Sequence, residues 1–183
     1  MFFKMDIRKA IEATAVLLRL TPNRAMDRKR LLAFLYLADR KSLERSGRPI
    51  VGGRMVAMPY GPIHSEVYDL IKGARDQAEW SRHFSNEGYR INLTDEIRVT
   101  FLSRFEIELL NEISSIYSGF DTWDVANETH EFAEYKKNYH DGTSTPISLE
   151  DLVSAVGRKS DQQAIVKDAA EKAYYDEMFA EKK

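Results

Sequence analysis

The stretch that decides the fold is Met58-Pro59-Tyr60-Gly61-Pro62-Ile63-His64-Ser65-Glu66-Val67-Tyr68. Pro59 has no amide hydrogen, so it predicts the end of an extended run. Gly61 predicts a turn, because glycine adopts backbone angles that other residues avoid. Pro62 suits the first position of a helix, where the missing donor costs nothing. The stretch therefore predicts a strand end, a turn and a helix start, in that order.

The helix that follows is expected to run from Pro62 to about Lys72, with Gly73 as its stop. Its apolar residues recur at the spacing of one helical face: Ile63, Val67, Leu70 and Ile71. Polar residues point elsewhere: His64, Ser65, Asp69 and Lys72. Tyr60 and Tyr68 are expected in the core, with hydroxyls that reach a polar partner.

Two helices are predicted upstream, the first over about residues 6–20. The second begins after Asp27, a good N-cap, and ends near Ser46, because Gly47 is a favourable C-terminal cap. Its centre, residues 31–38, is apolar nearly all round, which is typical of a helix buried by neighbours on several sides. Asp39 is expected to return this helix to solvent and to pair with Arg54.

Downstream, the signals are shorter. Extended segments are expected at residues 50–51, 54–58, 80–84, 89–93 and 97–101, with a small hairpin among the last three. Helices are predicted from a capping box of Ser103 and Glu106, from Asp121 or Thr122 to His130, over residues 152–156 behind Ser148, and from Asp161 to Glu181. The fold class is mainly α (α+β): a compact helical domain with a small β-hairpin or sheet, plus C-terminal helices.

Composition excludes several classes of protein. The chain has no cysteine, so disulfides, zinc ribbons, iron–sulfur clusters and thiol catalysis are excluded, and a reducing cytoplasm is the natural setting. No apolar run approaches the ~20 residues that a membrane helix needs. Lys4, Asp6, Arg8 and Lys9 fall where the apolar segment of a signal peptide would lie. We therefore expect a cytoplasmic protein with no membrane partner.

Charge is unevenly distributed along the chain. Residues 1–54 hold 13 Lys and Arg against 5 Asp and Glu, a net of +8, and residues 55–183 balance this with −10. A basic front half is compatible with an acidic partner or nucleic acid. The predicted order helix, helix, strand, helix, hairpin is also that of many winged-helix domains, so the alternative function is a nucleic-acid-binding transcriptional regulator. No run of five basic residues occurs, which favours two solvated halves that attract each other.

Two histidine motifs were candidates for chemistry. His130-Glu131-Phe132-Ala133-Glu134 reads H-E-x-x-E and lacks the second histidine of a zinc protease helix. His64 and Ser65 diverge by about 100° on a helix, which is poor geometry for a nucleophile and its base. Phosphate-binding glycine loops are absent from the sequence. We therefore expect a protein that is not an enzyme and uses no metal or cofactor.

Aromatic residues offer a further alternative. Stacking platforms for single-stranded nucleic acid are conceivable from Phe34, Tyr36, Tyr60, Tyr68, Trp80 and Trp123. Their helical spacing favours core positions instead.

Several segments together resemble the Panacea domain, the SocA-like antitoxin family of bacteria and their phages. They are Leu31-Leu32-Ala33-Phe34-Leu35-Tyr36-Leu37-Ala38-Asp39-Arg40, Gly47-Arg48-Pro49-Ile50, the stretch from Ala57 to Tyr68, Leu102-Ser103-Arg104-Phe105-Glu106 and the pair Thr129-His130. The resemblance covers about residues 7–135. Family members often have a bulky aromatic after the Thr-His pair, and Phe132 or Tyr135 takes that place here.

This resemblance implies a phage-associated antitoxin that neutralises a cognate toxin by direct protein–protein binding. Because one member delivers its toxin to a protease, an AAA+ protease is a second implied partner, and nucleic acid is not expected as the main one. The expected organisation is a Panacea-like domain over residues 1–140 and a C-terminal helical extension over 141–183, packed on or beside it. The motif residues read as structural are Asp39, Gly47, Pro49, Tyr60, Gly61, Pro62, Tyr68, Thr129 and His130.

The surface that faces the toxin is expected on two helices. Toxins of this family vary, so we place the interface on the exposed side of residues 64–72 and on the final helix. The candidate residues are His64, Asp69, Lys72, Glu171, Tyr174 and Asp176. The sequence leaves the oligomeric state open.

Overall fold

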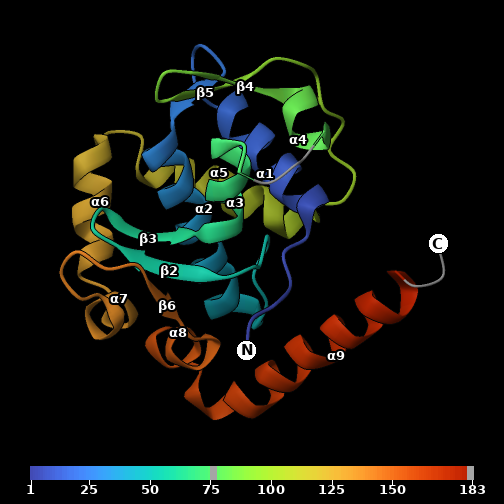
Figure 1. The fold of residues 1–183 in the computed structure, drawn as a ribbon, viewed down its shortest axis with the longest axis vertical. Helices are drawn as coiled ribbons and strands as arrows, with labels where there is room; N and C mark the ends of the chain where they lie inside the picture. Colours follow the sequence, from blue (N-terminus) through green and yellow to red (C-terminus); the bar gives the residue numbers. More distant parts are fainter. Residues whose placement is uncertain (75–77, 181–183) are drawn as a thin grey trace.

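The computed structural model describes residues 1–74 and 78–180, which form a mainly helical α+β fold (Figure 1). The helices are α1 (Ile7–Arg19), α2 (Arg28–Ser46), α3 (Ser65–Lys72), α4 (Ala78–His83), α5 (Arg104–Ile116), α6 (Thr122–His130), α7 (Ala133–Asn138), α8 (Leu149–Ala155), a 3-10 turn (Lys159–Asp161) and α9 (Gln162–Ala180). The strands are β1 (Ala25–Asp27), β2 (Met55–Met58), β3 (Gly61–His64), β4 (Phe84–Glu87), β5 (Arg90–Leu93) and β6 (Thr145–Ile147). This confirms the predicted fold class.

The described strands form two small antiparallel sheets. One has the order β1-β5-β4 and the other the order β3-β2-β6. In the second sheet Met58 pairs with Gly61, so Pro59 and Tyr60 alone make the turn between β2 and β3. Figure 1 shows this sheet lying between α2, α6 and the C-terminal helices.

Helix α2 is the central element of the molecule. Every residue from Leu31 to Asp39 is buried, as the apolar run predicts for all but Asp39. The helix begins behind Asp27, whose carboxylate accepts the backbone N–H groups of Lys29 and Arg30, and it ends at Gly47 in the left-handed conformation. Both predicted ends are therefore confirmed.

Two hydrophobic clusters use different faces of α2. The larger one joins Leu35 and its neighbours to α1, α3, α5 and the β1-β5-β4 sheet. The smaller one joins Tyr36 and Leu43 to β2, β6, α8 and the start of α9. Because α2 contributes to both clusters, it holds the N-terminal and C-terminal elements in one body.

The predicted helix start at Pro62 is wrong. Pro62 lies in β3 opposite Ala57, and α3 begins at Ser65 with His64 as its N-cap residue. Since β3 is an edge strand, a proline is tolerated there just as it is at a helix start. The predicted strand end at Met58, the turn and the helix stop at Gly73 are all present.

The hairpin prediction is correct only in its middle. Strands β4 and β5 pair around the turn at Gly88 and Tyr89, whereas Trp80 lies in α4. The third strand of this sheet is β1, which was predicted as helix cap and loop, and β6 was predicted as a connecting segment. Residues 97–101 are not a strand.

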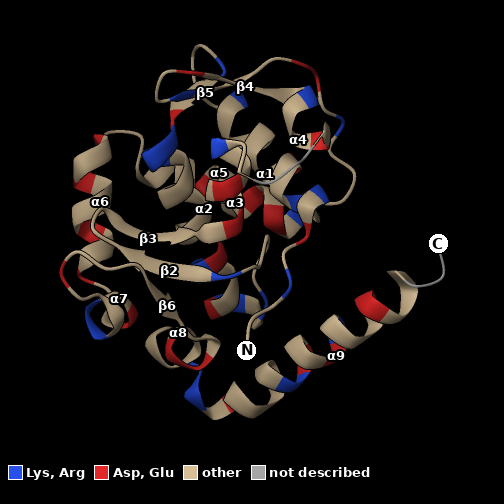
Figure 2. Ribbon diagram, viewed as in Figure 1, with Lys and Arg blue, Asp and Glu red and all other residues tan. Residues whose placement is uncertain are grey.

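The last helix extends away from the rest of the molecule. Only Ile165 and Ala169 of α9 are buried, and Figure 1 shows its C-terminal half projecting beyond the body. The predicted end at Glu181 lies outside the described residues. Figure 2 shows acidic and basic positions interspersed along this helix.

Ion pairs between the two halves of the chain balance part of the uneven charge. Basic residues of the first 54 positions pair with later carboxylates: Lys9 with Glu106, Arg24 with Glu96, Arg40 with Glu134, Arg45 with Glu112 and Arg48 with Asp168. The two halves therefore attract each other, as the sequence led us to prefer.

Candidate functional site

Asp39 fastens the loop that follows α2. Its carboxylate accepts the backbone N–H groups of Ile50, Val51 and Gly52, each at 2.8 Å. It is fully buried and does not pair with Arg54, so both the predicted partner and the predicted exposure are wrong. Burial raises the pKa of Asp39, while His64 and the three amides act in the opposite direction. Asp39 thus holds three consecutive backbone amides of the loop that follows Gly47 and Pro49.

His64 is also fully buried, which removes it from the candidate interface. Its Nδ1 lies 3.0 Å from the carbonyl oxygen of Gly52, and its Nε2 lies 3.5 Å from Oδ2 of Asp39. The neighbouring Ser65 accepts a hydrogen bond from Arg54 instead. An enclosed histidine turned away from Ser65 has a structural role in joining β3 to the Asp39 loop.

Gly61 brings the two halves of the family motif together. Its φ of +114° is disfavoured for any residue with a side chain. A Cβ atom at this position would lie 2.7 Å from Oγ1 of Thr129, a buried side chain that donates to the carbonyl of Ala126. The Tyr-Gly-Pro turn and the Thr-His pair therefore meet in space, and only glycine allows that approach.

The His and Glu side chains of the H-E-x-x-E segment contact different partners. Glu134 is buried and accepts hydrogen bonds from the hydroxyl of Tyr36 at 2.8 Å and from Nε of Arg40 at 2.6 Å. Glu131 pairs with Lys136 at the surface. The ring of His130 stacks on Tyr135 at 4.7 Å, and burial lowers the pKa of His130. Glu134 is thus engaged by two donors in the interior, and His130 packs against an aromatic ring.

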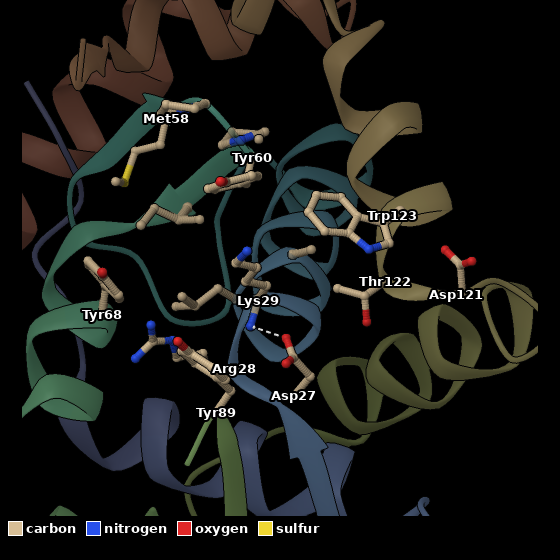
Figure 3. Close-up of a pocket in the computed structure, with 16 residues that line it drawn as sticks. Asp27, Arg28, Lys29, Met58, Tyr60, Tyr68, Tyr89, Asp121, Thr122 and Trp123 are labelled. Carbon is tan, nitrogen blue, oxygen red and sulfur yellow. Dashed lines mark hydrogen bonds between the residues drawn. The ribbon is translucent and has the colours of Figure 1, made fainter. Parts of the chain in front are cut away.

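An open groove of about 640 Å³ lies where α2, the β2–β3 turn and α6 begin or end (Figure 3). Its wall includes Lys29, Met58, Tyr60, Tyr68, Tyr89 and Trp123. Tyr60, Tyr89 and Trp123 are 54%, 67% and 57% exposed. The core position predicted for Tyr60 is therefore wrong, and Tyr68 is only partly buried.

The aromatic rings of this groove are arranged around two cations. Tyr60 and Trp123 meet edge to face with their centroids 5.7 Å apart. Nζ of Lys29 lies 3.8 Å from the centre of the Tyr60 ring and 5.0 Å from that of Trp123. On the opposite wall Arg28 lies over the ring of Tyr89 at 4.8 Å. Figure 3 shows these side chains turned toward the same space.

Two cations, Arg28 and Lys29, and two carboxylates, Asp27 and Asp121, line the groove. Asp27 caps α2 and Asp121 caps α6, so each carboxylate is engaged by backbone N–H groups. Within residues 1–74 and 78–180, no carboxylate lies within ion-pair distance of the side chain of Arg28 or Lys29. We name this site, comprising Arg28, Lys29, Tyr60, Tyr89 and Trp123, the aromatic groove.

A second, shallower hollow adjoins the aromatic groove. It shares Met58, Ile63 and Tyr68 with the groove and continues over Asp69 and Lys72 of α3. The remaining candidate interface residues, Glu171, Tyr174 and Asp176, lie on the projecting half of α9, where Tyr174 is 62% exposed. The predicted interface is thus spread over two separate elements.

Sequence reasoning missed the aromatic groove. Tyr60 and Trp123 are 63 positions apart, and Arg28 and Lys29 are indistinguishable in the sequence from the other basic residues of the front half. In the sequence, the only signal was the position of Trp123 between the polar residues Thr122 and Asp124, and its helical spacing led us to interpret it as a core residue.

Within residues 1–74 and 78–180, no group of three or more His, Asp or Glu side chains is arranged to hold a metal ion. In the same part of the chain, no helix has both the length and the apolar character needed to cross a bilayer.

Comparison with known proteins gives one finding. No curated protein and no solved structure matches the chain. The model of the family described as antitoxin SocA-like, Panacea domain, matches residues 31–136, from the buried half of α2 to α7. That family implies an antitoxin role with a cognate toxin as partner. Since the match covers more than half of the sequence and includes the Asp39 loop and the contact between Gly61 and Thr129, the chain belongs to the SocA-like antitoxins with a Panacea domain.

Proposed function

We propose that this protein neutralises its cognate toxin by direct protein–protein binding and without catalysis of its own. Membership of the SocA-like antitoxin family carries the proposal. The burial of His64 and the pairing of Glu134 with Tyr36 and Arg40 support it, because the histidine motifs are used in packing. Exposed aromatic side chains in a groove and on α9 are of the kind that dominates binding energy at interfaces.

The proposed toxin interface keeps five of the six candidate residues. Asp69 and Lys72 line the hollow on α3, and Glu171, Tyr174 and Asp176 lie on the projecting half of α9. A helix that leaves the body with exposed tyrosines offers a surface that can vary without disturbing the core. Charge reversal at Glu171 and Asp176 is therefore expected to weaken toxin binding.

Co-expression is the direct test of the antitoxin role. The product of the neighbouring reading frame is expected to arrest growth when expressed alone and to be harmless with this protein. Purified together, the two proteins are expected to elute as one complex. A product that is harmless alone, or toxicity that this protein leaves unchanged, would refute the proposal.

Delivery of the toxin to an AAA+ protease is the finer form of the proposal. It predicts that the half-life of the toxin falls when this protein is present and recovers in a strain without the protease. Neutralisation with an unchanged half-life would leave occlusion as the mechanism.

A regulator that binds nucleic acid is the second candidate function. The elements α1, β1, α2, α3, β4 and β5 with the sheet order β1-β5-β4 resemble a winged-helix domain, although β2 and β3 are inserted before α3 and α4 follows it, and this resemblance favours the regulator. The helix in the recognition position is α3, which carries Glu66 and Asp69 against Lys72, and two acids oppose binding to phosphates. Gel-shift assays with the upstream DNA at low salt test this function, and no shift would exclude it.

A further inference from the structure

The aromatic groove exposes large side chains that a folded protein normally covers. Tyr60, Tyr89 and Trp123 are each more than half exposed, although they lie close together around one hollow. Tryptophan and tyrosine in a concave site are the side chains that most often anchor a partner. The volume of about 640 Å³ is within the range of ~300–1,000 Å³ for ligand-binding pockets.

Charge complementarity indicates what the groove binds. Several basic residues of the front half pair with carboxylates, whereas Arg28 and Lys29 lie against aromatic rings with no carboxylate of residues 1–74 or 78–180 within ion-pair distance. A cation against a ring keeps its charge, so each remains able to attract a carboxylate. The groove therefore combines two cations about an apolar floor that includes Leu32 and Met58.

The sequence of β3 disfavours one mode of protein recognition. Addition of a strand to β3 would need free backbone donors along its edge, and Pro62 removes one of them. Recognition must then use side chains. Single-stranded nucleic acid is also disfavoured, since two cations are too few to form a basic track along a phosphate backbone, whereas a single carboxylate needs no such track.

We infer that the aromatic groove binds a short acidic segment of the cognate toxin, with an apolar or aromatic side chain seated against Tyr60 and Trp123 and a carboxylate between Arg28 and Lys29. This rests on the proposed antitoxin function and adds the site and the chemistry of the partner. The site is separate from the candidate interface on α9.

Charge reversal at Lys29 is a suitable test, because it should not harm the fold. Lys29 lies in the first turn of α2, where a negative side chain is favoured by the helix dipole. Lys29→Glu and Trp123→Ala are expected to raise the Kd for the purified product of the neighbouring gene at least tenfold. The matched controls are Arg104→Glu and Ile116→Ala, exposed changes on α5, which should keep the Kd within about twofold of wild type. Thermal unfolding of each variant verifies that it is folded.

A charge swap makes the test specific. One acidic residue of the toxin is expected to weaken binding to the wild-type antitoxin when it is changed to lysine. The same toxin variant is expected to bind the Lys29→Glu protein again. Groove variants that bind the toxin with wild-type affinity would overturn the inference. A single-stranded oligonucleotide that quenches Trp123 fluorescence and competes with the toxin for the groove would also overturn it. If wild-type protein neither binds nor neutralises that product, the proposed function fails instead; if it does both and only α9 variants are impaired, the inference alone fails.

Discussion

Asp39 and His64 illustrate how single polar residues organise this fold. Three backbone N–H donors replace the water that the Asp39 carboxylate loses on burial. The same hydrogen bonds order residues 50–52. His64 then links that loop to β3 through Gly52. Asp39 and His64, two residues of the segments that resemble the family, are thus connected to each other inside the protein, whereas Tyr60 of the same segments is exposed in the aromatic groove.

Gly61→Ala is expected to destabilise the protein by roughly 2–4 kcal/mol. About 1–3 kcal/mol comes from a side chain at a disfavoured backbone angle, and the rest from the new Cβ atom 2.7 Å from Oγ1 of Thr129. Urea unfolding measures the loss. Gly73→Ala is the matched control, because Gly73 has a positive φ with no atom within 4 Å. A loss for Gly61→Ala no larger than that for Gly73→Ala would contradict the prediction.

His130 is expected to make stability depend on pH. In the unfolded chain a histidine titrates near its ordinary value of 6.5, and burial lowers the pKa of His130 in the folded protein. Between these two values the unfolded state holds a proton that the folded state lacks, so the free energy of unfolding falls as pH decreases below 6.5. His130→Gln should lose less stability than wild type between pH 7 and pH 5. His140→Gln, at an exposed position, should follow the wild type, and an unchanged slope for His130→Gln would contradict the prediction.

Residue roles could be predicted where the partner is near in sequence and not where it is distant. Asp27, Gly47 and the Ser103 capping box act on their own helices and were predicted correctly. Asp39 was placed in solvent, because its amide partners are 11 to 13 positions away and a polar residue at a helix surface has no local sign of burial. The prediction for Tyr60 was wrong in the opposite direction, because it was placed in the core and is exposed.

At the scale of elements, pairing in space overrode local preference. Pro62 is compatible with both a helix start and an edge strand. It lies in a strand because it pairs with Ala57 of β2. Strands β1 and β6 have three residues each, too few to show an alternating pattern. Long helices such as α2 and α5 carried many periods of their pattern and were predicted nearly to the residue.

The C-terminal half of α9 is expected to be dispensable for folding. A chain that ends at Ala170 keeps Ile165 and Ala169, the two buried residues of this helix. We therefore expect a Tm within about 2 °C of the full chain, a shift of ~1 kcal/mol or less, together with reduced toxin neutralisation if Glu171, Tyr174 and Asp176 form the interface. A chain that ends at Gly157 loses both anchors and should be clearly less stable. Full neutralisation by the chain that ends at Ala170 would show that the toxin binds a surface other than the C-terminal half of α9.

For the whole molecule, the question is whether residues 141–183 form a separate unit. Strand β6 pairs with β2, and α8 packs in the same cluster as Tyr36 and Leu43 of α2. The larger cluster lies on the same helix, so disorder in one cluster should remove support from the other. The boundary at residue 140 that we expected from sequence stays a prediction, and cooperativity of unfolding tests it.

Val153→Ala is expected to lower the stability of the entire molecule in one transition. Val153 is fully buried in the smaller cluster, and loss of its two methyl groups should cost roughly 1–3 kcal/mol. Trp80 is buried in the larger cluster, so in a Trp123→Phe background its fluorescence reports that cluster alone. The fluorescence and circular dichroism midpoints should fall together, by about 2–4 °C for each kcal/mol. Ser154→Ala, exposed on the same helix, is the control and should leave both midpoints in place. A circular dichroism transition that moves while the Trp80 transition stays would show that residues 141–183 unfold independently.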